Sequence, residues 1–187
     1  MPKEKIQIAI DRGNGVTASG AKLELLAIEA IGPGNVAMVV ECLAEHRLRC
    51  LQEVKAILTK FGAQPTPTAY LFTRKGVIRL ARGDLDPENV LEVALEVEGT
   101  EDVEDVEEGE SEGPEIVVTT DISALGNVVQ GLKAAFKDVQ VLSSSIEYIP
   151  NEDTMVEVPE KKRDDLDNVI TRLQEYQDVT NVATNIL

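Results

Sequence analysis

The sequence is poor in aromatic residues and cysteine, and it contains no long apolar run. Aromatic side chains make up 3% of the 187 residues and tryptophan is absent, so a core must be built from Val, Ile, Leu and Ala. Two cysteines, Cys42 and Cys50, are too few for the disulfide framework of a small secreted domain. No segment approaches the ~20 consecutive apolar residues of a membrane-spanning helix. These absences favour a globular protein with reduced thiols and no membrane partner.

Residues that carry catalysis or bind cofactors are also scarce. The single histidine, His46, stands between the cysteines at the spacing C-x₃-H-x₃-C, but structural zinc takes four closed ligands and usually a C-x₂₋₄-C pair. Neither Gly13-Asn14-Gly15 nor Gly32-Pro33-Gly34 continues into a dinucleotide or P-loop fingerprint. No nucleophile and base form a credible catalytic constellation. We therefore expect a protein that is not an enzyme and has no metal or cofactor site.

Positive charge is missing from the middle of the chain. Residues 83–132 contain 16 Asp and Glu and no Lys or Arg, whereas residues 1–82 contain 12 basic and 7 acidic residues. The net charge of −16 therefore hides a basic first part and an acidic remainder. The basic part could meet phosphate while the acidic part faces away from a polyanion. The alternative, which is the commoner case, is that these charge runs are solvated faces.

Apolar spacing predicts a strand hairpin and then a helix in the first part of the chain. Apolar runs at 23–31 and 36–43 flank the turn Gly32-Pro33-Gly34-Asn35, which predicts an antiparallel hairpin. A stripe at helical spacing predicts a helix over 51–61, with Cys50 at its N-cap position. Two further strands are expected at 69–72 and 77–80, joined by a turn over 73–76.

The remainder of the chain repeats this alternation. Asp86-Pro87 opens one helix, and Thr120 or Asp121 can cap the next. In all, further helices are expected at 2–12, 87–97, 125–136 and 159–176, and further strands at 116–118, at 139–142 with an extension that can reach 148, at 155–158 and at 179–184. Residues 98–114 are acidic and Gly-containing, which predicts a mobile loop with room for a short strand near 103–106. Short strands and helices in this order suggest two packed α+β units with open-faced antiparallel sheets.

Several segments, taken in chain order, resemble those of one known family. These segments are Met1–Ile6, Ala9-Ile10, Arg12-Gly13, Ile31–Ala37, Val40–Leu43, Ala69–Phe72, Lys75–Ile78, Ala94–Glu96, Glu101–Glu104, Ile149-Pro150 and Asp178–Val182. Arg47-x-Arg49 falls where that family carries an Arg-Asn-Arg run before a helix. The chain is similar in this way to the YebC/PmpR family, which includes the mitochondrial translational activator of cytochrome c oxidase subunit I.

The resemblance implies an α+β fold of two ferredoxin-like domains with antiparallel sheets, one inserted into the other and preceded by a short helix. On that pattern, residues 1–17 are a remnant helix and linker, 18–82 with 151–187 form the first domain, and 83–150 form the acidic inserted domain. On the same resemblance, the family's basic N-terminal helical domain is expected to be missing from this sequence. The chain also departs from the family at Asn35, where Gly is usual, and at Cys50, where Thr is usual.

The resemblance further implies a regulator of gene expression, with translational activation at the ribosome as the first hypothesis. Members are expected to help synthesis through difficult stretches such as proline-rich ones. The implied partners are the ribosome, ribosomal RNA or mRNA, bound by a monomer without a cofactor. The residues expected to contact RNA are Arg47, Arg49, Arg74 and Lys75, with Gly32, Pro33 and Gly34 offering close backbone approach.

Other interpretations stay open. The arginines at 47 and 49 could instead pair with Glu45 or Glu53, and the glycines could simply form a tight turn. A DNA-binding transcriptional regulator is a second hypothesis, although no helix carries the clustered basic residues of base readout. A protein-interaction module that uses an exposed sheet or the acidic face is a third. The compartment would be the mitochondrion for a eukaryotic member and the cytoplasm for a bacterial one.

Overall fold

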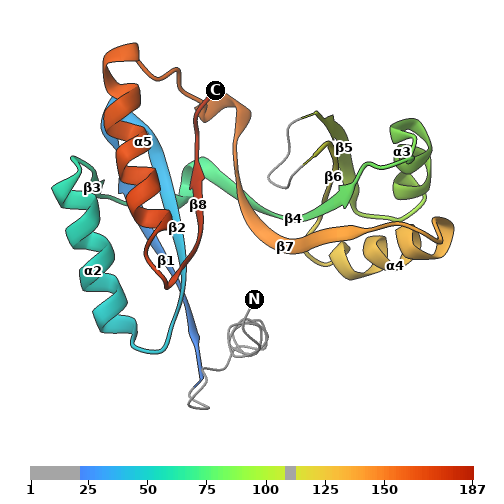
Figure 1. The fold of residues 1–187 in the computed structure, drawn as a ribbon, viewed down its shortest axis with the longest axis horizontal. Helices are drawn as coiled ribbons and strands as arrows, with labels where there is room; N and C mark the ends of the chain where they lie inside the picture. The colour runs from blue at the N-terminus through green and yellow to red at the C-terminus, as the bar shows by residue number, and fades with distance from the viewer. Residues whose placement is uncertain (1–21, 108–112) are drawn as a thin grey trace. The chain divides into compact units, whose positions relative to one another are not determined.

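The chain folds into two compact units, and the second is inserted into the first. The computed structural model describes residues 22–107 and 113–187 (Figure 1). One unit takes the chain as far as Thr73 and again from Pro150 to Leu187, and the other runs from Arg74 to Ile149. The helix and linker predicted over 1–17 lie outside the described residues. Within the described residues, each unit contains one four-stranded sheet and two α-helices, so the α+β prediction is confirmed.

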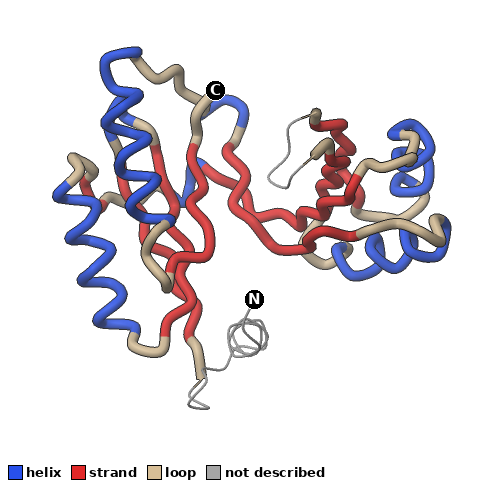
Figure 2. The backbone as a smooth tube through the Cα atoms, viewed as in Figure 1, coloured by secondary structure: helices blue, strands red, loops and turns tan. Residues whose placement is uncertain are grey.

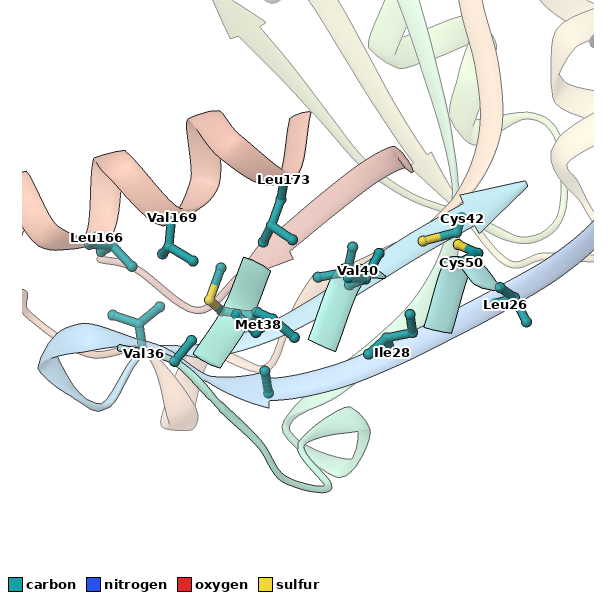
Figure 3. Close-up of a cluster of buried hydrophobic side chains, with 14 of the residues drawn as sticks. Leu26, Ile28, Val36, Met38, Val40, Cys42, Cys50, Leu166, Val169 and Leu173 are labelled. Carbon is teal, nitrogen blue, oxygen red and sulfur yellow. The ribbon is translucent and has the colours of Figure 1, made fainter. Parts of the chain in front are cut away.

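The first unit is an antiparallel sheet with two helices against one face. The strand order is β3-β1-β2-β8, and the central hairpin pairs Ile31 with Ala37 and Glu24 with Ala44, as the turn predicted. Alternate strand residues and the apolar stripes of both helices form one buried cluster, which Figure 3 shows in part. The elements are β1 (Glu24–Ile31), β2 (Ala37–Ala44), α2 (Arg47–Lys60), β3 (Gln64–Pro65), α5 (Glu160–Gln174) and β8 (Val179–Thr184).

The second unit has the β-α-β-β-α-β order of a ferredoxin-like fold. Its strands lie in the order β5-β6-β4-β7, and apolar residues of the sheet and of both helices form a second core. Figure 2 shows the backbone of these strands and helices. Asp86 caps the first helix, because its carboxylate accepts a hydrogen bond from the backbone N–H of Glu88 at 3.3 Å. The elements are β4 (Phe72–Ala81), α3 (Pro87–Leu95), β5 (Thr100–Val106), β6 (Glu115–Thr120), α4 (Leu125–Ala135) and β7 (Val141–Pro150).

One strand, β4, replaces the two strands and the turn that were predicted over 69–80. Residues 69–71 form a 3₁₀ turn, and the strand then runs unbroken through Gly76. This glycine serves close packing and not a turn, since a Cβ there would collide with Thr120 and lie 3.1 Å from Leu125. Because β4 joins the second sheet, the division falls at 73/74 and 149/150, whereas the predicted boundaries were 82/83 and 150/151.

Other differences concern helix starts and one strand. Helix α2 begins at Arg47, four residues before the predicted start, so Cys50 is buried inside the helix and His46 occupies the N-cap position. The predicted start was late because the exposed residues of the first turn carry no apolar stripe. The N-cap position of α4 is occupied by Ala124, and not by Thr120 or Asp121 as predicted. The strand predicted at 155–158 is reduced to a single bridge between Val156 and Ile186.

Candidate nucleic-acid interface

The glycine turn between β1 and β2 is shaped by packing. The Gly32 N–H donates to the Val36 carbonyl at 2.7 Å, and a Cβ on Gly32 would lie 2.8 Å from the Met38 sulfur. Gly34 has φ of 78°, a left-handed conformation that favours glycine. Gly32 and Pro33 are buried. The tight-turn interpretation therefore explains both glycines.

The turn nevertheless borders open space. A groove of about 390 Å³ is lined by the turn residues together with Gly62, Gln64 and Thr66. A second groove of about 350 Å³ shares Pro33 and Gly62 and is lined by Lys60 and Lys162. The backbone of the turn is thus accessible from one side, close to two lysines at the ends of α2 and α5.

Arg47 and Arg49 lie at the opposite end of the hairpin from this turn. Strand β2 separates them from the turn, and its eight residues span roughly 26 Å at ~3.3 Å per residue. The two arginines stand in the first turn of α2 and are exposed. The structure therefore does not bring the arginines and the glycine turn into one site.

Internal ion pairs do not prevent the side chains of Arg47 and Arg49 from binding an external anion. Within residues 22–107 and 113–187, no ion pair of Arg47 is formed. Arg49 Nε lies 3.9 Å from Glu53 Oε1, and both side chains are about half exposed, at 53% and 48%. Such an exposed pair contributes no more than about 1 kcal/mol, so it would not hold Arg49 back from a stronger partner.

Arg74 and Lys75 belong to the second unit, in strand β4 and not in the predicted loop. The Arg74 guanidinium lies over the ring of Tyr148, with 5.5 Å to the centroid. Lys75 forms an ion pair with Glu101. Of these two residues, Arg74 is the more available to a phosphate.

The idea that residues 1–82 present one basic surface is wrong. Arg79 makes two hydrogen bonds to Glu147, at 2.6 and 3.0 Å, inside the second unit. Arg82 pairs with Asp105 at 3.1 Å and with Glu107 at 3.0 Å. Both arginines therefore form ion pairs with acidic residues of the second unit. They do so because β4 belongs to the sheet of that unit, whose other strands come from the acidic part of the chain.

The cysteines and His46 do not form a metal site in the structure. Cys42 and Cys50 lie side by side in the first core (Figure 3), whereas His46 is exposed. Burial raises the pKa of both thiols. Among the described residues, no group of three or more metal-ligating side chains comes together.

The sequence model for the second and third domain of TACO1/YebC proteins matches residues 23–186. The chain belongs to this family. A probable transcriptional regulatory protein of Geobacter sulfurreducens is 35% identical over 99% of this chain and 71% of its own length. One of Streptomyces coelicolor is 32% identical with the same coverage. The resemblance seen in the sequence is thus confirmed, and the relatives' names support a regulator of gene expression.

A solved structure also supports the fold. The crystal structure of a conserved hypothetical protein, Aq1575 of Aquifex aeolicus, matches all of this chain and 74% of its own with a TM-score of 0.78 at 29% identity. Among the helices of residues 22–107 and 113–187, none combines the length and apolar character needed to cross a bilayer.

Two features of this TACO1/YebC chain escaped the sequence reasoning. Tyr148 is the aromatic partner of Arg74, and Lys162 borders the groove beside the glycine turn. Both pairings join residues more than 70 positions apart, through the contact of β4 with β7 and of α5 with the turn. The pairing of β4 with β7 and the packing of α5 on the turn are long-range contacts that local sequence patterns do not reveal.

Proposed function

We propose that this chain is a translational activator that contacts ribosomal RNA through the exposed side of α2. The observation that carries the proposal is the charge of that helix. It holds four basic residues, at 47, 49, 55 and 60, against the single acidic residue Glu53, and all five are exposed. The helix therefore carries a net charge of +3 in a molecule whose net charge is strongly negative, which favours contact with phosphate.

The distribution of charge supports binding in one orientation. Residues 74–149 contain 18 acidic and 6 basic residues, so the second unit is repelled by any polyanion. Helix α2, at 14 residues, is roughly 21 Å long and can follow several phosphates of one strand. Contacts of this kind position the protein on the backbone and do not read the base sequence. A protein that binds the phosphate backbone without reading the base sequence can still bind one defined particle, such as the ribosome.

A second candidate is transcriptional regulation through DNA, which the names of the relatives favour. Specific DNA binding needs side chains that reach base edges, and Arg47 and Arg49 at the start of α2 are the residues placed to do so. Both candidates use the same helix, so the nucleic acid itself must distinguish them.

The test uses charge reversal on α2. The double variant Arg47→Glu/Arg49→Glu should weaken co-sedimentation with ribosomes by about tenfold or more. It should also reduce the slope of log K against log salt by roughly 1.5, since each lost phosphate contact removes ~0.7 to 0.9. The matched control is Lys161→Glu/Arg163→Glu at the exposed start of α5, which should change binding less than threefold.

Parallel titrations with ribosomal RNA and duplex DNA at 50 and 200 mM salt identify the partner. Preference for RNA or ribosomes that depends on Arg47 and Arg49 supports translation. Preference for duplex DNA moves the proposal to transcription. Equal loss in the α5 control, or no ribosome binding at low salt, refutes the contact through α2. Circular dichroism of each variant checks that the fold is retained.

The proposed role is that of a non-enzymatic, monomeric factor located where translation takes place. That compartment is the mitochondrion for a eukaryotic chain and the cytoplasm for a bacterial one. Fractionation of the tagged protein together with ribosomes from each compartment tests this assignment, and a chain found away from ribosomes contradicts it.

A further inference from the structure

The outer side of helix α3 in the second unit exposes apolar side chains in an acidic setting. Leu91 and Leu95 are spaced i, i+4 on this helix and are 37% and 56% exposed. The adjacent side of the helix, with Val90 and Ala94, is fully buried in the second core. The two leucines therefore contribute little to the core that holds the helix in place.

Three glutamates run beside these leucines. Glu88, Glu92 and Glu96 follow one another at i, i+4 spacing, and all are exposed. No Lys or Arg occurs between residues 83 and 132, so no basic side chain from this part of the chain neutralises them. The helix thus presents an apolar pair next to a row of carboxylates.

A groove lies beyond the end of α3. It has a volume of about 420 Å³ and is lined by residues 97–99, which follow the helix, by Asp121, by the two residues before α4 and by Asn127 in its first turn. Glu98 and Asp121 supply carboxylates to the lining, and Val97 and Ala124 supply apolar groups. Ile122, next to Asp121 in the chain, is 43% exposed. The groove therefore repeats the chemistry of the helix surface.

We propose that this surface, formed by the outer side of α3 and the groove lined by Val97, Glu98, Asp121 and Ala124, docks a basic protein segment with apolar side chains. The proposal is independent of RNA binding by α2. Apolar contact with Leu91 and Leu95 would supply affinity, and Lys or Arg of the partner would meet the row of glutamates.

Charge selects this occupant over the others. A second copy of the chain would bring a unit with 18 acidic and 6 basic residues against its own equivalent. Nucleic acid and anionic lipid carry the same sign as the surface and would be repelled. A cationic protein gains from both the carboxylates and the leucines, and the attraction is screened by salt.

The test uses the full chain and a defined probe. The probe is a fluorescein-labelled 14-residue Lys/Leu peptide whose leucines fall on one side of a helix, followed by anisotropy at 50 and 200 mM salt. Leu91→Ser/Leu95→Ser should weaken binding by about tenfold. Glu88→Gln/Glu92→Gln/Glu96→Gln should weaken it by a similar factor at 50 mM and by less at 200 mM salt.

Two matched controls carry equivalent changes in the first unit. Leu25→Ser/Leu48→Ser removes two leucines that are more exposed, at 75% and 74%. Glu152→Gln/Asp153→Asn/Glu157→Gln removes three exposed carboxylates. Both controls should bind the peptide within twofold of the unchanged chain. Because all of these positions are exposed, the fold is expected to tolerate each change, which melting curves verify.

Several results would overturn the docking surface. Absence of peptide binding at 50 mM salt does so, as does equal weakening by the first-unit controls, which would indicate attraction by net charge alone. Unchanged binding by Leu91→Ser/Leu95→Ser also does so. Sedimentation of the free chain gives the last outcome, since a dimer that this variant dissociates would make a second copy the occupant. Loss of ribosome binding in the α2 variant leaves all of these results unaffected.

Discussion

The ion pair between Arg79 and Glu147 gives a prediction whose size follows from the structure. The two side chains are 15% and 16% exposed, and the guanidinium donates to the carboxylate at 2.6 and 3.0 Å. Ser145 donates a further hydrogen bond to Glu147 at 2.6 Å. Replacement by Arg79→Met keeps the apolar stem but leaves a nearly buried carboxylate without its cation. Loss of one partner of a buried pair costs ~3 to 5 kcal/mol, and the residual exposure lowers this to about 2 to 4 kcal/mol.

The dependence on pH has a definite sign. Burial alone would raise the pKa of Glu147, but hydrogen bonds from Arg79 and Ser145 outweigh it and hold the pKa below its ordinary value. A carboxyl group with a lowered pKa stabilises the fold above its unfolded-state pKa of ~4.3, and this contribution is lost as the pH falls through the folded-state pKa. In Arg79→Met, burial dominates and favours the protonated form. The difference in stability between the two proteins should therefore narrow from pH 7 to pH 4.

Urea unfolding followed by circular dichroism at pH 7, 5.5 and 4 measures this difference. Lys75→Met is the matched control, because Lys75 lies on the same strand as Arg79 and also forms an ion pair. The side chains of Lys75 and its partner Glu101 are more exposed, at 29% and 34%. The control should cost no more than about 1 kcal/mol. A difference below about 1 kcal/mol for Arg79→Met at pH 7, or one that stays constant with pH, would refute the reasoning.

Two further predictions concern packing. Gly76→Ala should destabilise the second unit by about 1 to 3 kcal/mol, because the new Cβ would collide with Thr120. Gly126→Ala has open space around its Cβ and should be neutral or stabilising by up to ~1 kcal/mol. Thermal melts that show equal effects of the two substitutions would contradict this. Cys42 and Cys50 should react with Ellman's reagent at pH 8 only as fast as the first unit opens, since both are buried and burial raises their pKa; complete reaction within the mixing time would contradict this.

Local pattern predicted much of the fold. The hairpin around Gly32 to Asn35 was found because a turn signal and two apolar runs specify it within about 20 residues. Strand β4 was predicted as two strands because the run Thr73-Arg74-Lys75-Gly76 has the composition of a turn. Gly76 is instead needed inside the strand, because it packs closely against residues more than 40 positions later in the chain. The start of α2 was missed because its first turn carries exposed side chains. Long-range packing thus explains the error in β4, whereas the error in α2 comes from an exposed first turn.

The candidate site was less predictable than the fold. Sequence could identify Arg47 and Arg49 as a basic pair, and the structure leaves them exposed on one helix. It could not show that Lys75 and Arg79 face acidic partners, because those pairs depend on which strands become neighbours. The sequence shows how many Lys and Arg residues the chain contains. The pairing of strands determines which of these side chains form internal ion pairs and which stay free to bind a partner.

The insertion has a consequence for the order in which a nascent chain can fold. The first unit needs α5 and β8, which come from residues after 150, to complete its core and its sheet. All residues of the second unit have emerged from a ribosome before these elements appear, and its two ends lie in the neighbouring strands β4 and β7. The inserted unit can thus close on itself first, and its closure shortens the loop that the outer unit must bridge.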